Sequence, residues 1–401
     1  MSVFRRYGEV LAPPGVAAAV VASVFGRLSL GMTGLALLLL VREATGSYAA
    51  AGAVSASYAV AFAVGAPSRA RAADRTGPAR VLRLSGVLHP LAFGLLVLLA
   101  DLRAPVLSMA GAAALVGLTV PPLGAVMRAL WGQLIPSAQL HTAYSLESVV
   151  VEACFVLGPL LVAGLTVLSP AVAVLASAAC AAVGALALAR LPVVRAVVPH
   201  EARPTNPAGP LVSPVVRACL LNVLWIGMGF GTIEVAVLAF VEEQGGARAT
   251  AGVVLAVWSL GSILGGLVYG GLHPAATAAR QLPVLVGAVS LGAFLPVLSP
   301  SVLVLALLLV LSGSTIAPFS ACNSMLLGQA APRGTVTEAF AWNGSMIFGG
   351  AAAGTALAGV LVDSYGARAA LVATAVTGLL TFLSSLAGLA ALRTVRLPDR
   401  V

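Results

Sequence analysis

The chain has 401 residues, of which 60% are hydrophobic and 9% are charged, and its formal net charge is +9. Soluble proteins carry about 25% charged residues, so the polar surface is too small to cover a water-soluble globule, and most of the exterior must face lipid. The 22 basic residues are all arginines and lie mainly between apolar runs, which indicates membrane topology rather than nucleic-acid binding.

Twelve apolar runs are long enough to cross a membrane, for which a helix needs about 20 residues. In chain order they cover residues 15–40, 48–67, 81–100, 104–128, 142–166, 169–189, 214–241, 249–272, 281–298, 301–328, 336–362 and 367–392. The pattern predicts an all-α polytopic membrane protein with twelve helices in two six-helix halves, residues 1–189 and 214–401. The interval 190–213 carries five prolines and is expected to be a cytoplasmic linker.

The two halves are related by an offset of 200 residues. Residues 41–52 and 241–252 are identical at six of twelve positions, and Gly31 and Gly65 pair with glycines 200 residues later. A hydrophobic, duplicated chain that is polar mainly at its loops is typical of a membrane transporter built from two repeats.

The arginines are distributed unevenly between the two sides of the predicted bundle. With both termini in the cytoplasm, 17 arginines lie inside, four lie outside and Arg27 lies within a span. Arginine excess marks cytoplasmic loops, so we expect both termini inside. The use of arginine alone suggests a GC-rich genome, and we expect the inner membrane of a bacterium.

The segment after the second run reads Ser68-Arg-Ala-Arg-Ala-Ala-Asp-Arg-Thr-Gly-Pro-Ala-Arg80. It resembles the Gly-x-x-x-Asp-Arg-x-Gly-Arg-Arg loop of the major facilitator superfamily, although Ala70 replaces the leading glycine. The residues that match or follow the motif are Asp74, Arg75, Gly77 and Arg80. The resemblance implies a cytoplasmic latch, in which the acid pairs with basic residues and helix ends; a purely topogenic basic loop is the alternative.

The fifth run contains Gly158-Pro159 and, further on, Gly164. These residues partly resemble the Gly-Pro-x-x-Gly signature that antiporters of the same superfamily carry in their fifth helix. The resemblance implies export. A kink that serves only helix packing is the alternative, because proline and small residues permit both.

Ionisable residues within the spans are candidates for function, because a charge near the bilayer centre costs about 2.5–3.5 kcal/mol. The candidates are Arg27, Glu147, Glu152 and Glu234. Helices one and five are neighbours in the family that the chain resembles, so a pair of Arg27 with Glu152 is expected to be geometrically possible. The two helix-five glutamates are about 140° apart around the helix, so at most one should face a cavity.

Two interpretations of these charges stay open. Arg27 with one acid either forms a structural ion pair or tunes a glutamate that carries the proton. Glu234 follows three closely spaced glycines and either binds a cationic group or a proton, or makes a polar contact near a helix end.

Weaker candidates for contact with a substrate are polar or aromatic residues in spans that would line or flank the central cleft. They are Asn222, Trp225, Trp258, Asn323, Trp342 and Asn343. For each, helix packing is the alternative. The four cysteines are isolated, so neither a metal site nor a disulfide is expected, and the chain contains no phosphate-binding loop for ATP. We expect neither an enzyme nor a cofactor.

The sequence therefore predicts a proton-coupled transporter that exports a small lipophilic or cationic drug or metabolite and works as a monomer. Its expected partners are this substrate, protons and the lipid bilayer, without nucleic acid. An importer of a sugar, nucleoside or organic acid on the same fold is the main alternative, because fold does not decide substrate. A membrane sensor that has lost transport is a third possibility.

Overall fold

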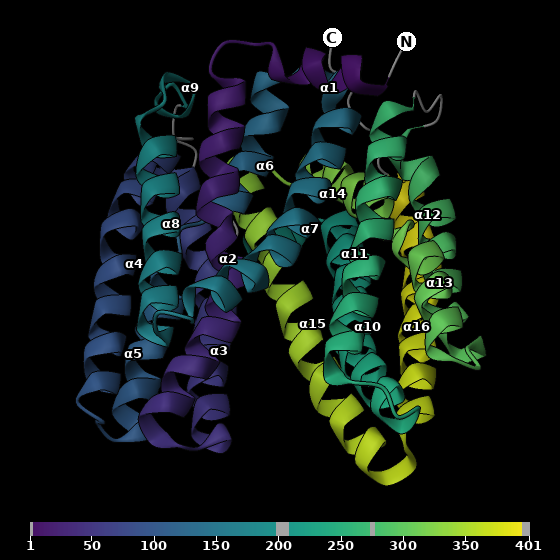
Figure 1. Ribbon diagram of the computed structural model, residues 1–401. Helices are drawn as coiled ribbons and strands as arrows, with labels where there is room; N and C mark the ends of the chain where they lie inside the picture. The colour runs from purple at the N-terminus through teal and green to yellow at the C-terminus, as the bar shows by residue number, and fades with distance from the viewer. Residues whose placement is uncertain (1–2, 198–207, 273–276, 395–401) are drawn as a thin grey trace.

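The computed structural model describes residues 3–197, 208–272 and 277–394, which form helices joined by short turns (Figure 1). Within these ranges, twelve helical stretches are long and apolar enough to cross a membrane, which confirms the predicted all-α fold and its twelve spans. Two short helices, α1 (Val3–Leu11) and α9 (Pro192–Arg195), accompany them.

The spanning helices pack into two bundles. The first bundle contains α2 (Val16–Thr45), α3 (Tyr48–Thr76), α4 (Pro78–Asp101), α5 (Val106–Thr119), α6 (Leu123–Leu134), α7 (Leu140–Leu165) and α8 (Pro170–Arg190). The second bundle contains α10 (Pro214–Glu243), α11 (Arg248–Gly271), α12 (Ala278–Phe294), α13 (Val302–Gly313), α14 (Ile316–Ala330), α15 (Val336–Tyr365) and α16 (Ala367–Thr394). Of the expected linker 190–213, residues 198–207 lie outside the described residues.

The fourth and tenth spans each consist of two helices. In the fourth span, Pro121 and Pro122 separate α5 from α6, because proline lacks the N–H that would continue the helix. This span ends at Leu134, six residues later than the predicted end at Arg128. Arg128 therefore lies inside a helix of the bundle, and its expected place in a loop after the fourth span is wrong.

The second span is longer than predicted. Residues 68–76 were expected to form a loop but continue α3 through Thr76. The helix ends at Gly77, whose φ of 88° lies in the region that favours glycine. Pro78 then starts α4 at the first helical position, where its missing N–H costs nothing.

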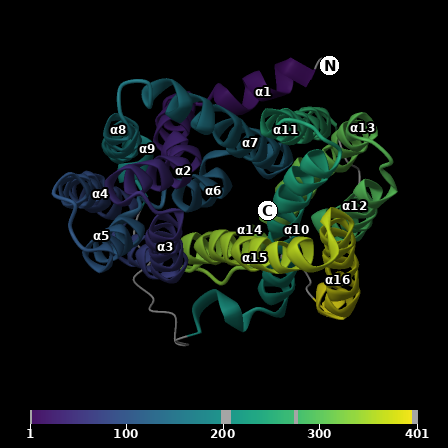
Figure 2. The same ribbon diagram turned by 60° about the horizontal axis from the view of Figure 1, so that its bottom comes forward.

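The two bundles meet at one end and diverge toward the other (Figure 1). We call the end where α1 lies the terminal end and the opposite one the distal end. Between the bundles, α7 packs against α11 and α14, and α3 and α6 pack against α15. Figure 2 shows α7 beside α11 and α3 beside α15.

The buried apolar residues follow the same division. At the terminal end one core joins both bundles and includes Trp131 and Tyr144 from the first and Phe319 and Phe340 from the second. At the distal end each bundle has a separate core, one around Phe93 and the other around Phe240. The terminal end is therefore closed by shared hydrophobic packing, and the distal end is not.

Candidate functional site

A buried charge cluster lies in the first bundle between α2, α6 and α7. Arg27 Nη1 and Nη2 donate to Glu147 Oε1 and Oε2 at 2.6 and 3.3 Å, and both side chains are only 3% exposed. Trp131 Nε1 donates to Glu147 Oε2 at 3.3 Å, and Arg128 Nε lies 3.8 Å from Glu147 Oε1. The Glu147 carboxylate thus accepts hydrogen bonds from one guanidinium group and an indole and lies within ion-pair distance of a second guanidinium group.

This geometry shows that the expected pair of Arg27 with Glu152 is wrong. Glu152 lies five residues further along α7, and its Oε1 accepts a hydrogen bond of 3.0 Å from Ser262 Oγ on α11. The rotation between positions 147 and 152 turns one acid toward α2 and the other toward the second bundle. Glu152 therefore takes part in a contact between the bundles, whereas Glu147 acts within one.

Arg128 and Trp131 are parts of the cluster that sequence reasoning missed. Their spacing of three residues places them on the same face of a helix, and this spacing was the available signal. It was missed because the predicted span ended at the arginine.

Glu234 lies on the distal half of α10. Phe230, one turn earlier, packs edge to face against Trp258 of α11 with ring centroids 5.3 Å apart. Gly231 packs on the backbone of α15 at Ala351. Around the axis of α10, position 234 lies between the side that faces α11 and the side that faces α15. Its side chain is exposed and faces the space between these two helices.

A polar cluster joins the bundles at the terminal end, and we call Arg71, Asp74, Thr337 and Glu338 the terminal clamp. Asp74 accepts hydrogen bonds from the backbone N–H groups of Thr337 and Glu338 at 3.2 and 2.9 Å, at the start of α15. Arg71 Nε and Nη2 donate to the two Glu338 oxygens at 2.9 and 2.5 Å. A carboxylate at a helix N-terminus is stabilised by the unpaired N–H groups and the helix dipole.

The clamp differs in one respect from the motif that predicted it. Its cation is Arg71, which lies one turn before Asp74, whereas Arg75 and Arg80 are exposed. Arg71 and Glu338 are therefore further residues that the motif did not identify, and the basic residues of the motif lie outside the clamp.

Further contacts close the same end. The Tyr7 hydroxyl of α1 donates to the carbonyls of Gly266 and Leu267 on α11, and Thr142 Oγ1 of α7 donates to the carbonyl of Gly270 at 2.8 Å. Nearer the middle of the helices, the rings of Phe62 and Phe348, from α3 and α15, meet edge to face with centroids 5.3 Å apart.

The helix-five motif residues have separate roles in the structure. A Cβ added at Gly158 would lie 2.4 Å from the carbonyl carbon of Gly31, so α2 and α7 touch through two glycines. Pro159 is exposed within a continuous α7, and Gly164 is exposed with open space around it. Of the three motif residues, only Gly158 takes part in this close helix contact.

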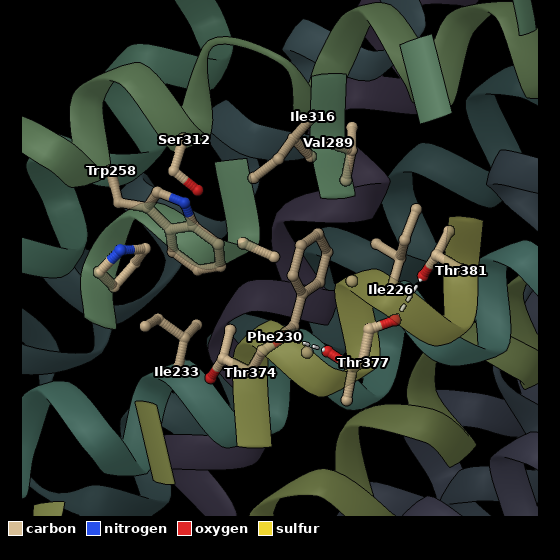
Figure 3. Close-up of a pocket in the computed structure, with 14 residues that line it drawn as sticks. Ile226, Phe230, Ile233, Trp258, Val289, Ser312, Ile316, Thr374, Thr377 and Thr381 are labelled. Carbon is tan, nitrogen blue, oxygen red and sulfur yellow. Dashed lines mark hydrogen bonds between the residues drawn. The ribbon is translucent and has the colours of Figure 1, made fainter. Parts of the chain in front are cut away.

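Three of the six weaker candidates, the asparagines, make hydrogen bonds between helices of the second bundle. Asn222 accepts from Ser384 Oγ of α16 at 2.8 Å, and Asn323 Nδ2 donates to Asn343 Oδ1 at 3.3 Å, which ties α14 to α15. The remaining candidates are three half-buried tryptophans: Trp225, Trp258 and Trp342. Of the three tryptophans, Trp258 lines a pocket between α10, α11 and α16 (Figure 3). No group of metal-ligating side chains occurs among the described residues.

Twelve spanning helices in two bundles, with ionised side chains buried among them, define a polytopic membrane transporter. The family model of the Major Facilitator Superfamily matches residues 19–272, and the chain belongs to this superfamily. It is therefore a secondary transporter and not an enzyme. No curated protein matches the chain.

Several solved structures share the fold. The human organic anion transporter MFSD10 (TETRAN) is 17% identical, has a TM-score of 0.73, and the match covers 93% of this chain and 100% of that one. A bacterial homologue of the iron transporter ferroportin in an outward-facing state is 12% identical, with a TM-score of 0.78 and coverage of 93% and 98%. The E. coli fucose:proton symporter FucP is 14% identical, with a TM-score of 0.72 and the same coverage. These likenesses establish the fold alone.

Proposed function

We propose that the protein exports a small lipophilic or cationic compound in exchange for protons, by alternating access. The observation that carries the proposal is the position of Glu152, whose described partner is the Ser262 hydroxyl of the other bundle at 3.0 Å. A carboxylate within the membrane that has only a hydroxyl as partner is costly while it is charged. Binding a proton relieves that cost, and the contact with Ser262 links the proton to the movement of the bundles.

In this proposal Glu147 has a structural role. Its carboxylate is neutralised by Arg27 and Arg128 and lies wholly within the first bundle, so a change in the relative position of the bundles does not disturb it. A proton on Glu147 would leave two buried guanidinium groups without an anion. We therefore assign proton coupling to Glu152 and cation binding to Glu234, which is exposed between α11 and α15.

In the proposed cycle the halves 1–189 and 214–401 move as rigid units joined by the linker 190–213. With both termini in the cytoplasm of a bacterium, as the arginine distribution favours, the closed terminal end is cytoplasmic and the structure is the outward-facing state. Support comes from the terminal clamp and the shared core at that end and from the similarity to an outward-facing ferroportin homologue. The protein would then function as a monomer in the inner membrane.

Proton release from respiring everted vesicles tests this proposal. Addition of the lipophilic cation tetraphenylphosphonium or the neutral antibiotic chloramphenicol is expected to collapse the acid-inside gradient, measured with a pH-sensitive dye. Glu152→Gln should abolish the response to both compounds, because glutamine cannot exchange a proton. Glu234→Gln should reduce the response to the cation about tenfold, as expected where the variant loses about 1.4 kcal/mol of charge attraction, and spare the neutral compound.

Glu43→Gln is the matched control, because Glu43 is an exposed glutamate at the distal end of α2 and should respond like the native protein. A native response in Glu152→Gln vesicles would contradict the assignment of the proton carrier. An importing symporter would leave the gradient unchanged when solute is added outside, since it needs solute and protons on the same side.

A further inference from the structure

Each bundle contains a pocket, and the two pockets occupy the same place in the repeat. One is lined by residues of the first bundle and the other, in Figure 3, by residues of the second. Six lining positions correspond at the offset of 200 residues. They are Gly26, Ser29, Leu30, Tyr58, His89 and Ala181 in the first bundle and Ile226, Gly229, Phe230, Trp258, Val289 and Thr381 in the second.

The backbone around the two pockets is equivalent as well. Gly117 of α5 packs on the carbonyl oxygen of Tyr58, and Gly313 of α13 packs on the carbonyl oxygen of Trp258. In both bundles a glycine therefore lets two helices touch beside the aromatic residue. Since the surrounding backbone matches, the pockets differ in what they can bind through their side chains.

The pocket of the first bundle is lined by polar side chains that already have partners within the same bundle. Arg27 is held by Glu147, His89 Nδ1 lies 3.2 Å from Thr119 Oγ1, and the Ser29 hydroxyl lies 2.9 Å from that of Ser177. Its polar groups are used to hold helices together.

The pocket of the second bundle is mainly apolar and has no ionisable lining residue. Gly229 and Val289 stand where the first pocket has Ser29 and His89, and further apolar side chains that line the pocket are Ile226, Phe230, Ile233 and Ile316. Three threonines of α16 also line it, but their hydroxyls donate to carbonyls of their own helix at 2.7–3.1 Å. Toward the pocket these threonines can therefore only accept hydrogen bonds.

Trp258 lines this pocket and carries a hydrogen-bond donor in its indole ring. Its indole Nε1 is buried and has no hydrogen-bond partner among the described residues. A buried donor without an acceptor is rare and costly, so its presence in a pocket points to an acceptor that arrives with a ligand. The edge-to-face contact with Phe230 fixes the indole ring in place.

We propose that this pocket binds the uncharged, apolar end of the transported compound, with Trp258 Nε1 donating to a carbonyl or ether oxygen. Glu234 lies one turn after Phe230, and side chains at this spacing are about 5–6 Å apart at Cβ. An amphiphilic cation can therefore place its charged end at Glu234 and its apolar end in the pocket. The inference rests on the proposed function and names the substrate class in it.

Binding of two matched probes to the purified protein in lipid nanodiscs tests the proposal. Acetophenone carries a carbonyl group and ethylbenzene has nearly the same shape without an acceptor. Calorimetric titration is expected to show a preference of about 2- to 10-fold for acetophenone, the range for one neutral hydrogen bond. Trp258→Phe should remove this preference and leave the affinity for ethylbenzene within about twofold.

Trp225→Phe is the matched control, because Trp225 lies on α10 but does not line the pocket, and it should keep the preference. Ala293→Leu, which fills the pocket from α12, should weaken binding of both probes while the protein elutes as a single folded species. Equal affinity for the two probes in the native protein, or a preference retained in Trp258→Phe, would overturn the proposal.

The titration is independent of proton coupling, so the two proposals can fail separately. Glu152→Gln protein should keep the preference for acetophenone even where it no longer releases protons. Loss of the preference in native protein that still releases protons would refute the pocket alone, and the reverse result would refute the proton carrier alone.

Discussion

Replacing Glu147 with glutamine is expected to lower the free energy of unfolding by about 3–5 kcal/mol, the usual effect of breaking a buried ion pair. The carboxylate accepts from Arg27 and Trp131 and lies beside Arg128. Its neutralisation leaves two guanidinium groups at membrane depth without an anion. Unfolding in mixed micelles with increasing denaturing detergent would measure the loss.

Two further variants separate this charge effect from packing. Glu147→Asp keeps the charge on a shorter side chain and should cost less than the glutamine variant, whereas Glu43→Gln on the same bundle should change the stability by less than about 0.5 kcal/mol, as exposed substitutions usually do. If Glu147→Gln kept native stability but lost proton release, Glu147 would be the proton carrier and the structural assignment would be incorrect.

Loss of the terminal clamp is expected to open the terminal end. Asp74→Asn removes the charge that accepts two backbone N–H groups at the start of α15. A hydrogen bond to a charged group contributes about 1.5–3 kcal/mol, and each 1.4 kcal/mol changes a population ratio about tenfold. We expect the ratio of open to closed terminal ends to rise about 10- to 100-fold.

Spin labels at positions 80 and 333 would report the change as a longer distance, since both residues are exposed at the terminal end, one on each bundle. The four native cysteines, Cys154, Cys180, Cys219 and Cys322, would first be replaced. Arg75→Gln is the control: Arg75 belongs to the same sequence motif but is exposed outside the clamp, so the distance should not change. An equal shift in both variants would show that the net charge of the segment, rather than the clamp, holds the end closed.

The number and class of the helices follow from the sequence because each span needs its own apolar run. The neighbours of a side chain do not follow, because they depend on the rotation of each helix about its axis. Arg27 was correctly placed within a span, yet the choice between Glu147 and Glu152 required the orientation of α7 against α2 and α11. Arg128 was misplaced for a related reason: its charge ended the predicted span, while in the fold Glu147 lies near enough to offset it.

The terminal clamp illustrates the same limit. The motif pointed to Asp74 and its segment, and the segment does reach the start of α15. Its partners Thr337 and Glu338 are more than 260 residues away, and no local pattern identifies them. The glycine pairs of the repeat, such as Gly31 and Gly231, were more informative, because a close contact between helix backbones leaves little choice of residue. A Cβ at Gly231 would lie 2.0 Å from the Ala351 carbonyl oxygen, and Gly31 is in similarly close contact with Gly158.

The apolar core that both bundles share at the terminal end gives the transport cycle a thermal signature. Opening that end brings side chains such as Phe319 and Phe340 into contact with water, and hydration of apolar surface raises the heat capacity. The enthalpy and entropy of opening must then change with temperature, so the populations of the two states will not follow a straight van 't Hoff line. Cooling weakens hydrophobic association, and the closed terminal end will be held less firmly in the cold than at moderate temperature.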